Sequence, residues 1–320
     1  MVTFINVLRA LACCIITNSH YTGVYPLDFI ANGGLAGNAL FCAVSGYCLY
    51  HIRSNFPQWY GKRLIRCYLP VWIITAVYVL LGCFTTAEQS LLSSFLFPTR
   101  YHFVASIILL YIPFFIVMKV KVLREHLPWV LGGLGVVAAV YYALFFDKSY
   151  WHVEDVRGFL ERCTLFAAML MGASFRQNDG KYRDKLCKWL ILLAPLMFGV
   201  YLGGNFVFSR KASLAMFQII SPLCRLVLVY CVFRLFMGLD GALQKLPKAV
   251  RRCIDFLAAM TLEVYLVQGE IIDWLRPKFG FPVNWLVLTA AILLAGLALH
   301  WVCEGLMKLW EVLFRKPKTP

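Results

Sequence analysis

The sequence consists of apolar stretches, each about as long as a helix needs to cross a membrane, separated by charged or Pro/Gly-rich segments. A helix requires roughly 20 apolar residues to span the hydrocarbon core of a bilayer. We therefore predict transmembrane helices near residues 4–22, 34–52, 66–84, 103–118, 127–146, 159–175, 188–208, 213–236, 253–275 and 284–306. The predicted fold class is an all-α integral membrane protein with about ten transmembrane helices. The segments between them are too short for a soluble domain, and the apolar residues within 85–102 suggest an interfacial helix there.

The composition excludes two other classes of chain. Hydrophobic residues make up 61% of the sequence and charged residues 15%, whereas soluble domains are about half apolar and a quarter charged. The aromatic content of 16% excludes a disordered chain, because disordered segments contain few aromatic residues. The 12 cysteines form no CxxC pair or Cys/His cluster, so no metal site is predicted.

The distribution of charge predicts how the chain is oriented. Lys and Arg number 31 against 16 Asp and Glu, a formal net charge of +15. This excess would suggest nucleic acid as a partner of a soluble protein, but cytoplasmic loops of membrane proteins are also rich in Lys and Arg. With the N-terminus in the cytoplasm, most basic residues fall on the cytoplasmic side. We predict cytoplasmic N- and C-termini, a basic tail at 311–320, and a multi-pass cell-membrane protein whose partner is the lipid bilayer, with no nucleic acid.

The first predicted helix contains two side chains that are costly to place in a membrane, Arg9 and His20. They are 11 residues apart (20 − 9). This spacing is close to three helical turns, so both side chains share a face, roughly 16 Å apart along the axis. Arg9 is near the cytoplasmic end and His20 is in the outer half. The structural alternative is that Arg9 extends to the headgroups and His20 is hydrogen-bonded by a neighbouring helix.

The second and third predicted helices have their own distinctive patterns. Residues 37–47 are rich in small side chains, which let other helices pack closely. Arg63 and Arg66 share one helical face at the predicted cytoplasmic surface. Two guanidinium groups at this spacing suit a polyphosphate, because Arg binds phosphate oxygens with two parallel hydrogen bonds. Ordinary cytoplasmic charge bias explains the positive charge but not the spacing.

An ordered set of motifs resembles the membrane acyltransferase-3 family. The set comprises the Arg9-to-His20 spacing, Ser45-Gly46-Tyr47, Arg63-x-x-Arg66 with Pro70, Tyr101-His102-Phe103 with Tyr111, and Thr-Leu-Glu-Val-Tyr-Leu-Val-Gln at 261–268. The motifs follow the family's order and cover nearly the whole chain, so residues 1–310 are identified as the family's transmembrane domain. The segment 17–34 is most similar to a branch found with capsular and surface polysaccharides.

The resemblance implies a ten-helix membrane O-acyltransferase that moves an acyl group, usually acetyl, from acyl-CoA to a hydroxyl of a surface or capsular carbohydrate. It implies a catalytic role for His20 and acyl-CoA binding by Arg9, Arg63 and Arg66. Four further motif positions are predicted to bind substrate: Ser45, His102, Tyr265 and Gln268. Acetyl-CoA is then a co-substrate, with no permanently bound cofactor, and a homo-oligomer is left open.

Two positions depart from the family's pattern. Many relatives have Asp three residues before the first-helix Arg, where this chain has Asn6. Many also have His where Gln268 stands. An Asp–Arg pair is therefore lost at the first position, and the second is not an obligatory base in this chain.

The predicted mechanism uses His20 as the general base on the acceptor hydroxyl, because an imidazole titrates near neutral pH. A covalent acyl-imidazole is the alternative. Elsewhere, Arg225 is a charge in mid-helix, and Glu161 and Arg162 are neighbours whose side chains point apart. We therefore expect an ion pair between helices at Glu161.

Two other readings of the chain stay open. Ten helices with buried charges also suit a secondary transporter of a small metabolite. Such folds usually contain two similar halves, and nothing in 160–320 repeats the Arg–His or Arg-x-x-Arg pattern of the first half. A catalytically inactive relative is the second alternative, on account of Asn6 and Gln268.

Overall fold

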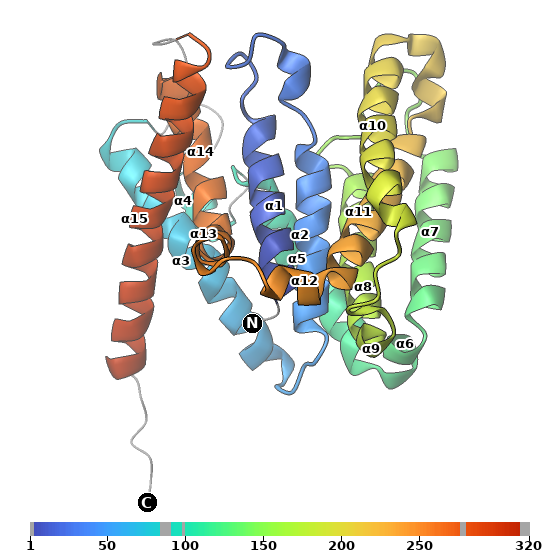
Figure 1. Ribbon diagram of the computed structural model, residues 1–320, viewed down its shortest axis with the longest axis horizontal. Helices are drawn as coiled ribbons and strands as arrows, with labels where there is room; N and C mark the ends of the chain where they lie inside the picture. The colour runs from blue at the N-terminus through green and yellow to red at the C-terminus, as the bar shows by residue number, and fades with distance from the viewer. Residues whose placement is uncertain (1–2, 84–90, 98–99, 276–279, 314–320) are drawn as a thin grey trace, which may run out of the picture.

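The computed structural model describes residues 3–83, 91–97, 100–275 and 280–313, and within these ranges the only regular secondary structure is helical. Figure 1 shows long helices standing side by side, with α1 and α2 near the middle, α14 and α15 on one side and α7 and α10 on the other. In this view α1 begins and α15 ends toward the same end of the bundle.

Each predicted span contains a long helix or most of one. These helices are α1 (Thr3–Ser19), α2 (Gly34–Leu49), α3 (Phe56–Leu80), α5 (His102–Lys119), α7 (Leu127–Leu144), α8 (Phe159–Gln177), α10 (Trp189–Arg210), α11 (Ile220–Gly238), α14 (Thr261–Leu275) and α15 (Val283–Leu313). By length and composition, 7 helical segments in the described part of the chain can cross a membrane. The helices α1, α8 and α14 are not among them, because α1 and α14 are short and α8 carries charged residues. An all-helical, multi-pass membrane protein is confirmed, whereas ten crossings and the orientation stay predictions.

Several predicted spans have different boundaries in the structure. The span predicted at 213–236 is η2 (Ala212–Phe217) followed by α11, and α15 continues past 306 to Leu313. Helix α3 begins at Phe56 and not at 66, because Asn55 caps its N-terminus by accepting a hydrogen bond from the backbone N–H of Gln58. The prediction followed the apolar residues only, whereas the capped helix continues through the charged ones. The span predicted at 253–275 is two helices, α13 (Lys248–Ala259) and α14.

The break between α13 and α14 lies at Met260. The hydroxyl of Thr261 donates to the carbonyl oxygens of Leu257 and Ala258, at 3.2 and 3.1 Å, and so satisfies acceptors in the last turn of α13. Figure 1 shows α13 nearly end on, so its axis crosses those of α1 and α14. Hydropathy does not reveal such a change of direction, because both helices are apolar on one side.

Short helices connect the long ones: η1 (Asp28–Ile30), α4 (Leu91–Leu96), α6 (Lys121–Glu125), α9 (Asp179–Tyr182), η2 (Ala212–Phe217) and α12 (Asp240–Gln244). Helix α4 lies within the range 85–102 in which a helix was expected, and its interfacial position stays a prediction. Its carbonyl groups at Phe95 and Leu96 accept hydrogen bonds from Trp72 Nε1 and Tyr68 Oη, at 2.8 and 2.7 Å.

The closest helix packing is between α2 and α8. A Cβ atom added to Gly46 would lie 1.8 Å from the backbone oxygen of Met169, and one added to Gly172 would lie 1.8 Å from that of Ala43. The two backbones are therefore in direct contact, as glycine permits and no other residue does. The small residues of α2 also contact α1, where Gly37 packs on Ile16. This confirms the close packing expected from residues 37–47.

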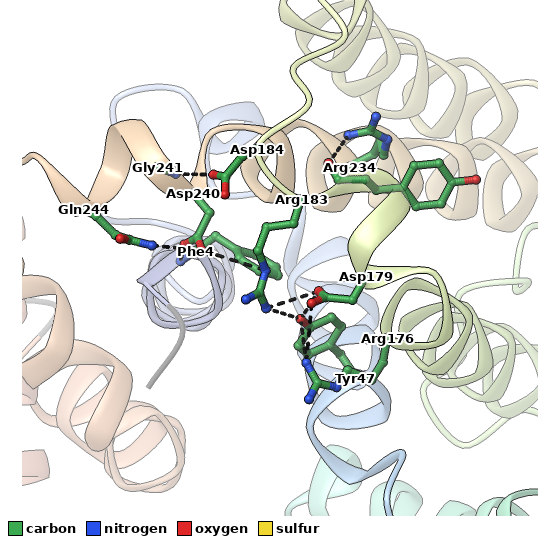
Figure 2. Close-up of polar contacts among 11 residues, drawn as sticks. Phe4, Tyr47, Arg176, Asp179, Arg183, Asp184, Arg234, Asp240, Gly241 and Gln244 are labelled. Atoms are coloured by element: carbon green, nitrogen blue, oxygen red, sulfur yellow. Dashed lines mark hydrogen bonds and ion pairs between the residues drawn. The ribbon is translucent and has the colours of Figure 1, made fainter.

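A cluster of hydrogen bonds and ion pairs connects several helices at the end of the bundle where α1 begins (Figure 2). The Tyr47 hydroxyl donates to Asp179 and accepts from Arg183 Nη2 at 2.7 Å. The backbone N–H of Phe4 donates to the carboxylate of Asp240, at 2.9 Å. Tyr47, from the Ser-Gly-Tyr motif, thus anchors α2 to the connection between α8 and α10.

We expect Gly46→Ala to lower the thermal stability of the purified protein, because its Cβ has no room against the Met169 carbonyl. The loss should be about 1–3 kcal/mol or more, measured as a lower Tm in detergent. Gly133→Ala is the matched control, since a Cβ there meets nothing within 4 Å. Equal Tm values for the two variants would contradict the packing described.

Candidate active site

A cleft of about 300 Å³ opens where α1 ends and α2 begins. It brings together three of the predicted site residues, His20, His102 and Tyr265, which come from three different parts of the chain. The other lining residues are Ile16, Ser19, Ala31, Asn32, Gly34, Leu35, Asn38, Phe103, Ser106, Glu154, Val156, Glu161, Leu165 and Tyr201.

The turn after α1 places His20 at the rim of this cleft. Helix α1 ends at Ser19, and the backbone N–H of His20 still donates to the carbonyl of Thr17, at 3.1 Å. The chain then reverses and enters α2 through Gly33, whose φ of +91° is in the region that favours glycine. The Asn18 side chain holds the returning segment by donating to the Ile30 carbonyl, at 2.7 Å. The His20 imidazole is exposed and free to meet a ligand.

Asp273 of α14 is the acidic group within electrostatic range of His20. A carboxylate near an imidazole stabilises its protonated form and can orient the ring. Sequence analysis assigned no role to Asp273, because its distance from His20 along the chain hides the proximity. The only signal was an acidic residue near the end of an apolar helix.

His102 and Tyr265 are held by hydrogen bonds. Arg157 Nε donates to His102 Nδ1 at 3.1 Å, so in the neutral ring the proton is on Nε2. The Tyr265 hydroxyl accepts from the backbone N–H of Phe103, at 3.3 Å, and the rings of Phe103 and Tyr265 meet edge to face. His102 can therefore donate a hydrogen bond into the cleft, beside two aromatic rings.

Two acidic residues, Glu154 and Glu161, form the side of the cleft toward α8 and α10. Glu161, 1% exposed, pairs with Arg225 of α11, which is 0% exposed. This ion pair between helices confirms the expectation for Glu161 and supplies the partner of Arg225. Glu154 accepts hydrogen bonds from Tyr201 Oη and Asn205 Nδ2, both at 2.8 Å. Sequence analysis missed Glu154 because it lies in a connection and not in an apolar span.

The cleft also presents polar atoms without partners in the described part of the chain. The Oδ1 atom of Asn38 and the Oε1 atom of Glu161 are buried and accept no hydrogen bond there. Buried acceptors are normally paired. Donor groups of a bound molecule, such as hydroxyls, would satisfy both.

The predicted acyl-CoA residues gather toward the other end of α1. Arg9 is half-buried and lies within electrostatic range of Arg66 and of the Glu263 carboxylate. The Arg63 guanidinium lies 5.5 Å from the centre of the Trp59 ring, and its buried Nε has no hydrogen-bond partner among the described residues. The structure therefore brings the three arginines into one region, between α1 and α3.

Ser45 and Gln268 do not line the cleft. Ser45 is half-buried on α2, toward the end that carries Tyr47. Gln268 is 1% exposed, and neither side-chain polar atom has a hydrogen-bond partner in the described ranges. Their substrate-binding roles stay predictions. No group of His, Cys, Asp and Glu that could hold a metal ion is found among the described residues.

Comparison with known proteins gives one match. A family model described as an acyltransferase domain matches residues 2–305. No curated protein and no solved structure matches the chain.

We expect Arg225→Met to destabilise the protein by about 3–5 kcal/mol, because Glu161 is left buried without its partner. The double variant Glu161→Leu/Arg225→Met removes both charges, so it should recover most of the lost stability. Thermal unfolding of the detergent-solubilised variants measures both effects. A double variant less stable than Arg225→Met would show that the pair is not the cause.

Proposed function

Because the chain belongs to the acyltransferase-3 family, we propose that it transfers an acyl group, acetyl in the first instance, from cytosolic acyl-CoA to a hydroxyl group of a surface or capsular carbohydrate. The observation that supports this most directly is the cleft that joins His20 to His102 and Tyr265 at one end of α1. Arg9 lies toward the opposite end of α1, and Arg66 of α3 is within electrostatic range of it.

The separation of these two regions suits the donor. The pantetheine arm of acyl-CoA is on the order of the roughly 15 Å that α1 rises from Arg9 to Ser19, the residue before His20. The phosphates would lie on Arg9, Arg63 and Arg66, which supply guanidinium groups for bidentate contacts. The thioester would then reach the level of His20.

The acceptor side of the proposal is based on the chemistry of the cleft. Carbohydrates offer many hydroxyls and apolar ring faces. The cleft has acceptors on Asn38 and Glu161 that are unpaired among the described residues, a donor on His102, and the rings of Phe103 and Tyr265. Aromatic rings beside a few placed polar groups are typical of a small-molecule site.

In the proposed reaction His20 removes the proton from the acceptor hydroxyl as its oxygen attacks the thioester carbonyl. The tetrahedral intermediate then expels the CoA thiolate, breaking the C–S bond, and the imidazolium of His20 returns the proton to sulfur. Asp273 acts as a positioning residue that favours the imidazolium formed in between.

His20→Ala should lower acyl transfer by about 100-fold or more, because it removes the general base. The measurement is O-acetyl content of surface polysaccharide in cells that lack the protein and are complemented with each variant at equal membrane abundance. His51→Ala is the matched control, since this exposed histidine lies outside the cleft. Full activity in His20→Ala would exclude the assigned base. Wild type that adds no ester would favour an inactive relative or a transporter.

Asp273→Asn should lower kcat roughly tenfold or more while leaving KM for acyl-CoA unchanged, because Asp273 acts on His20 and not on the donor. Steady-state release of CoA thiol from purified protein measures both constants. A raised KM with unchanged kcat would instead place Asp273 in donor binding.

A further inference from the structure

A second hollow, of about 320 Å³, lies between the first turns of α1 and the crossing helix α13. It is separate from the cleft at His20 and shares no lining residue with it. Its lining residues are Thr3, Asn6, Lys248, Arg251, Arg252 and Asp255. The proposed mechanism assigns these residues no role, and the family resemblance concerns only Asn6, where many relatives have Asp.

The basic side chains come from one face of α13. Lys248, Arg251, Arg252 and Asp255 follow the spacing i, i+3, i+4, i+7, which places them on one side of a helix. Three cations therefore face the hollow together with one carboxylate. The Asp255 carboxylate is engaged, because it accepts a hydrogen bond from Asn6 Nδ2 at 2.6 Å.

Two buried polar atoms at the hollow have no partner among the described residues. Asn6 is 7% exposed, and its Oδ1 atom accepts no hydrogen bond there. The Nε atom of Arg251 is also buried without an acceptor. Buried polar groups are normally hydrogen-bonded, so leaving both atoms without a partner is unfavourable. A ligand with acceptor oxygens and a nearby hydroxyl or amine would satisfy both atoms.

We propose that this hollow is a phosphate-binding site. Phosphate oxygens match the forked donors of Arg251 and Arg252, and Lys248 adds a third positive charge. Asn6 precedes Arg9 by one turn of α1, so a phosphate here continues the row of positive groups that begins with Arg9. The Asn6 carbonyl accepts from a hydroxyl or amine beside the phosphate.

Two ligands carry this chemistry. One is the phosphorylated nucleotide of acyl-CoA, and this case rests on the proposed function. The other is the headgroup of an anionic phospholipid. Figure 1 shows α13 lying across the bundle, and a basic helix with an apolar face binds anionic headgroups in this orientation.

The test uses the full-length protein in nanodiscs and two variants, Arg252→Gln and Arg251→Gln. Arg252 is exposed, so Arg252→Gln should fold normally. It therefore keeps the test valid if Arg251→Gln fails to fold. The matched control is Lys245→Gln, an exposed lysine outside the hollow. One arm measures Kd for CoA and for dephospho-CoA in phosphatidylcholine discs. The other measures the rise in Tm when phosphatidylglycerol replaces phosphatidylcholine.

If the hollow binds the nucleotide, each variant should weaken CoA binding about tenfold, because one charge-assisted hydrogen bond is lost. The binding of dephospho-CoA should weaken less. Binding of the headgroup predicts unchanged CoA affinity and loss of the phosphatidylglycerol-dependent rise in Tm. Either result, with Lys245→Gln like wild type, supports a phosphate site. Wild-type behaviour of Arg252→Gln in both arms, or a wild type that responds to neither ligand, overturns it.

The two proposals fail separately. His20-dependent transfer with no effect of Arg252→Gln on either ligand would remove the phosphate site and leave the acyltransferase. A headgroup effect in a wild-type protein that transfers no acyl group would support the phosphate site and remove the acyltransferase proposal.

Discussion

The backbone contact between α2 and α8 is the constraint on which the rest of the structure depends. Gly46 and Gly172 each face a carbonyl oxygen of the opposite helix, at positions where a Cβ would be 1.8 Å away. In a bilayer, lipid is as apolar as the side chains, so close packing takes the place of the hydrophobic effect in holding helices together. Because α2 also packs on α1 through Gly37, this contact determines where Asn38 and the turn at His20 lie.

Charged groups within the bundle are paired across helices that are distant in sequence. Glu161 of α8 pairs with Arg225 of α11, and Glu154 accepts from two side chains of α10. At the opposite end, Tyr47, Asp179, Arg183 and Asp240 join α2 to the connections around it. These pairs satisfy groups that are costly to bury alone. Polar atoms that stay unpaired therefore mark the places where a ligand is expected.

Much of the fold was predictable, since the length of an apolar stretch and the periodicity of a helix are local properties. The close packing at Gly46 follows from spacing alone. His20, predicted to share a helix face with Arg9, lies one residue beyond the end of α1, so the shared face stays a prediction. The start of α3 at Phe56 and the break at Met260 do not, because they depend on hydrogen bonds of Asn55 and Thr261. Within the candidate site, His20, His102 and Tyr265 were predicted. Asp273 and Glu154 were missed because nothing in their sequence neighbourhood indicates what they approach.

The sequence by itself determined that the chain is a helical membrane protein, which residues are polar within apolar stretches, and the family to which the motifs belong. Only the tertiary structure decided which of those polar residues meet. It brought His20 within electrostatic range of Asp273, lined one cleft with His20, His102 and Tyr265, and set the basic face of α13 against Asn6. The physical reason is that helical periodicity orients a side chain on its own helix, whereas its partner depends on how helices pack, and that depends on contacts between residues far apart in the chain.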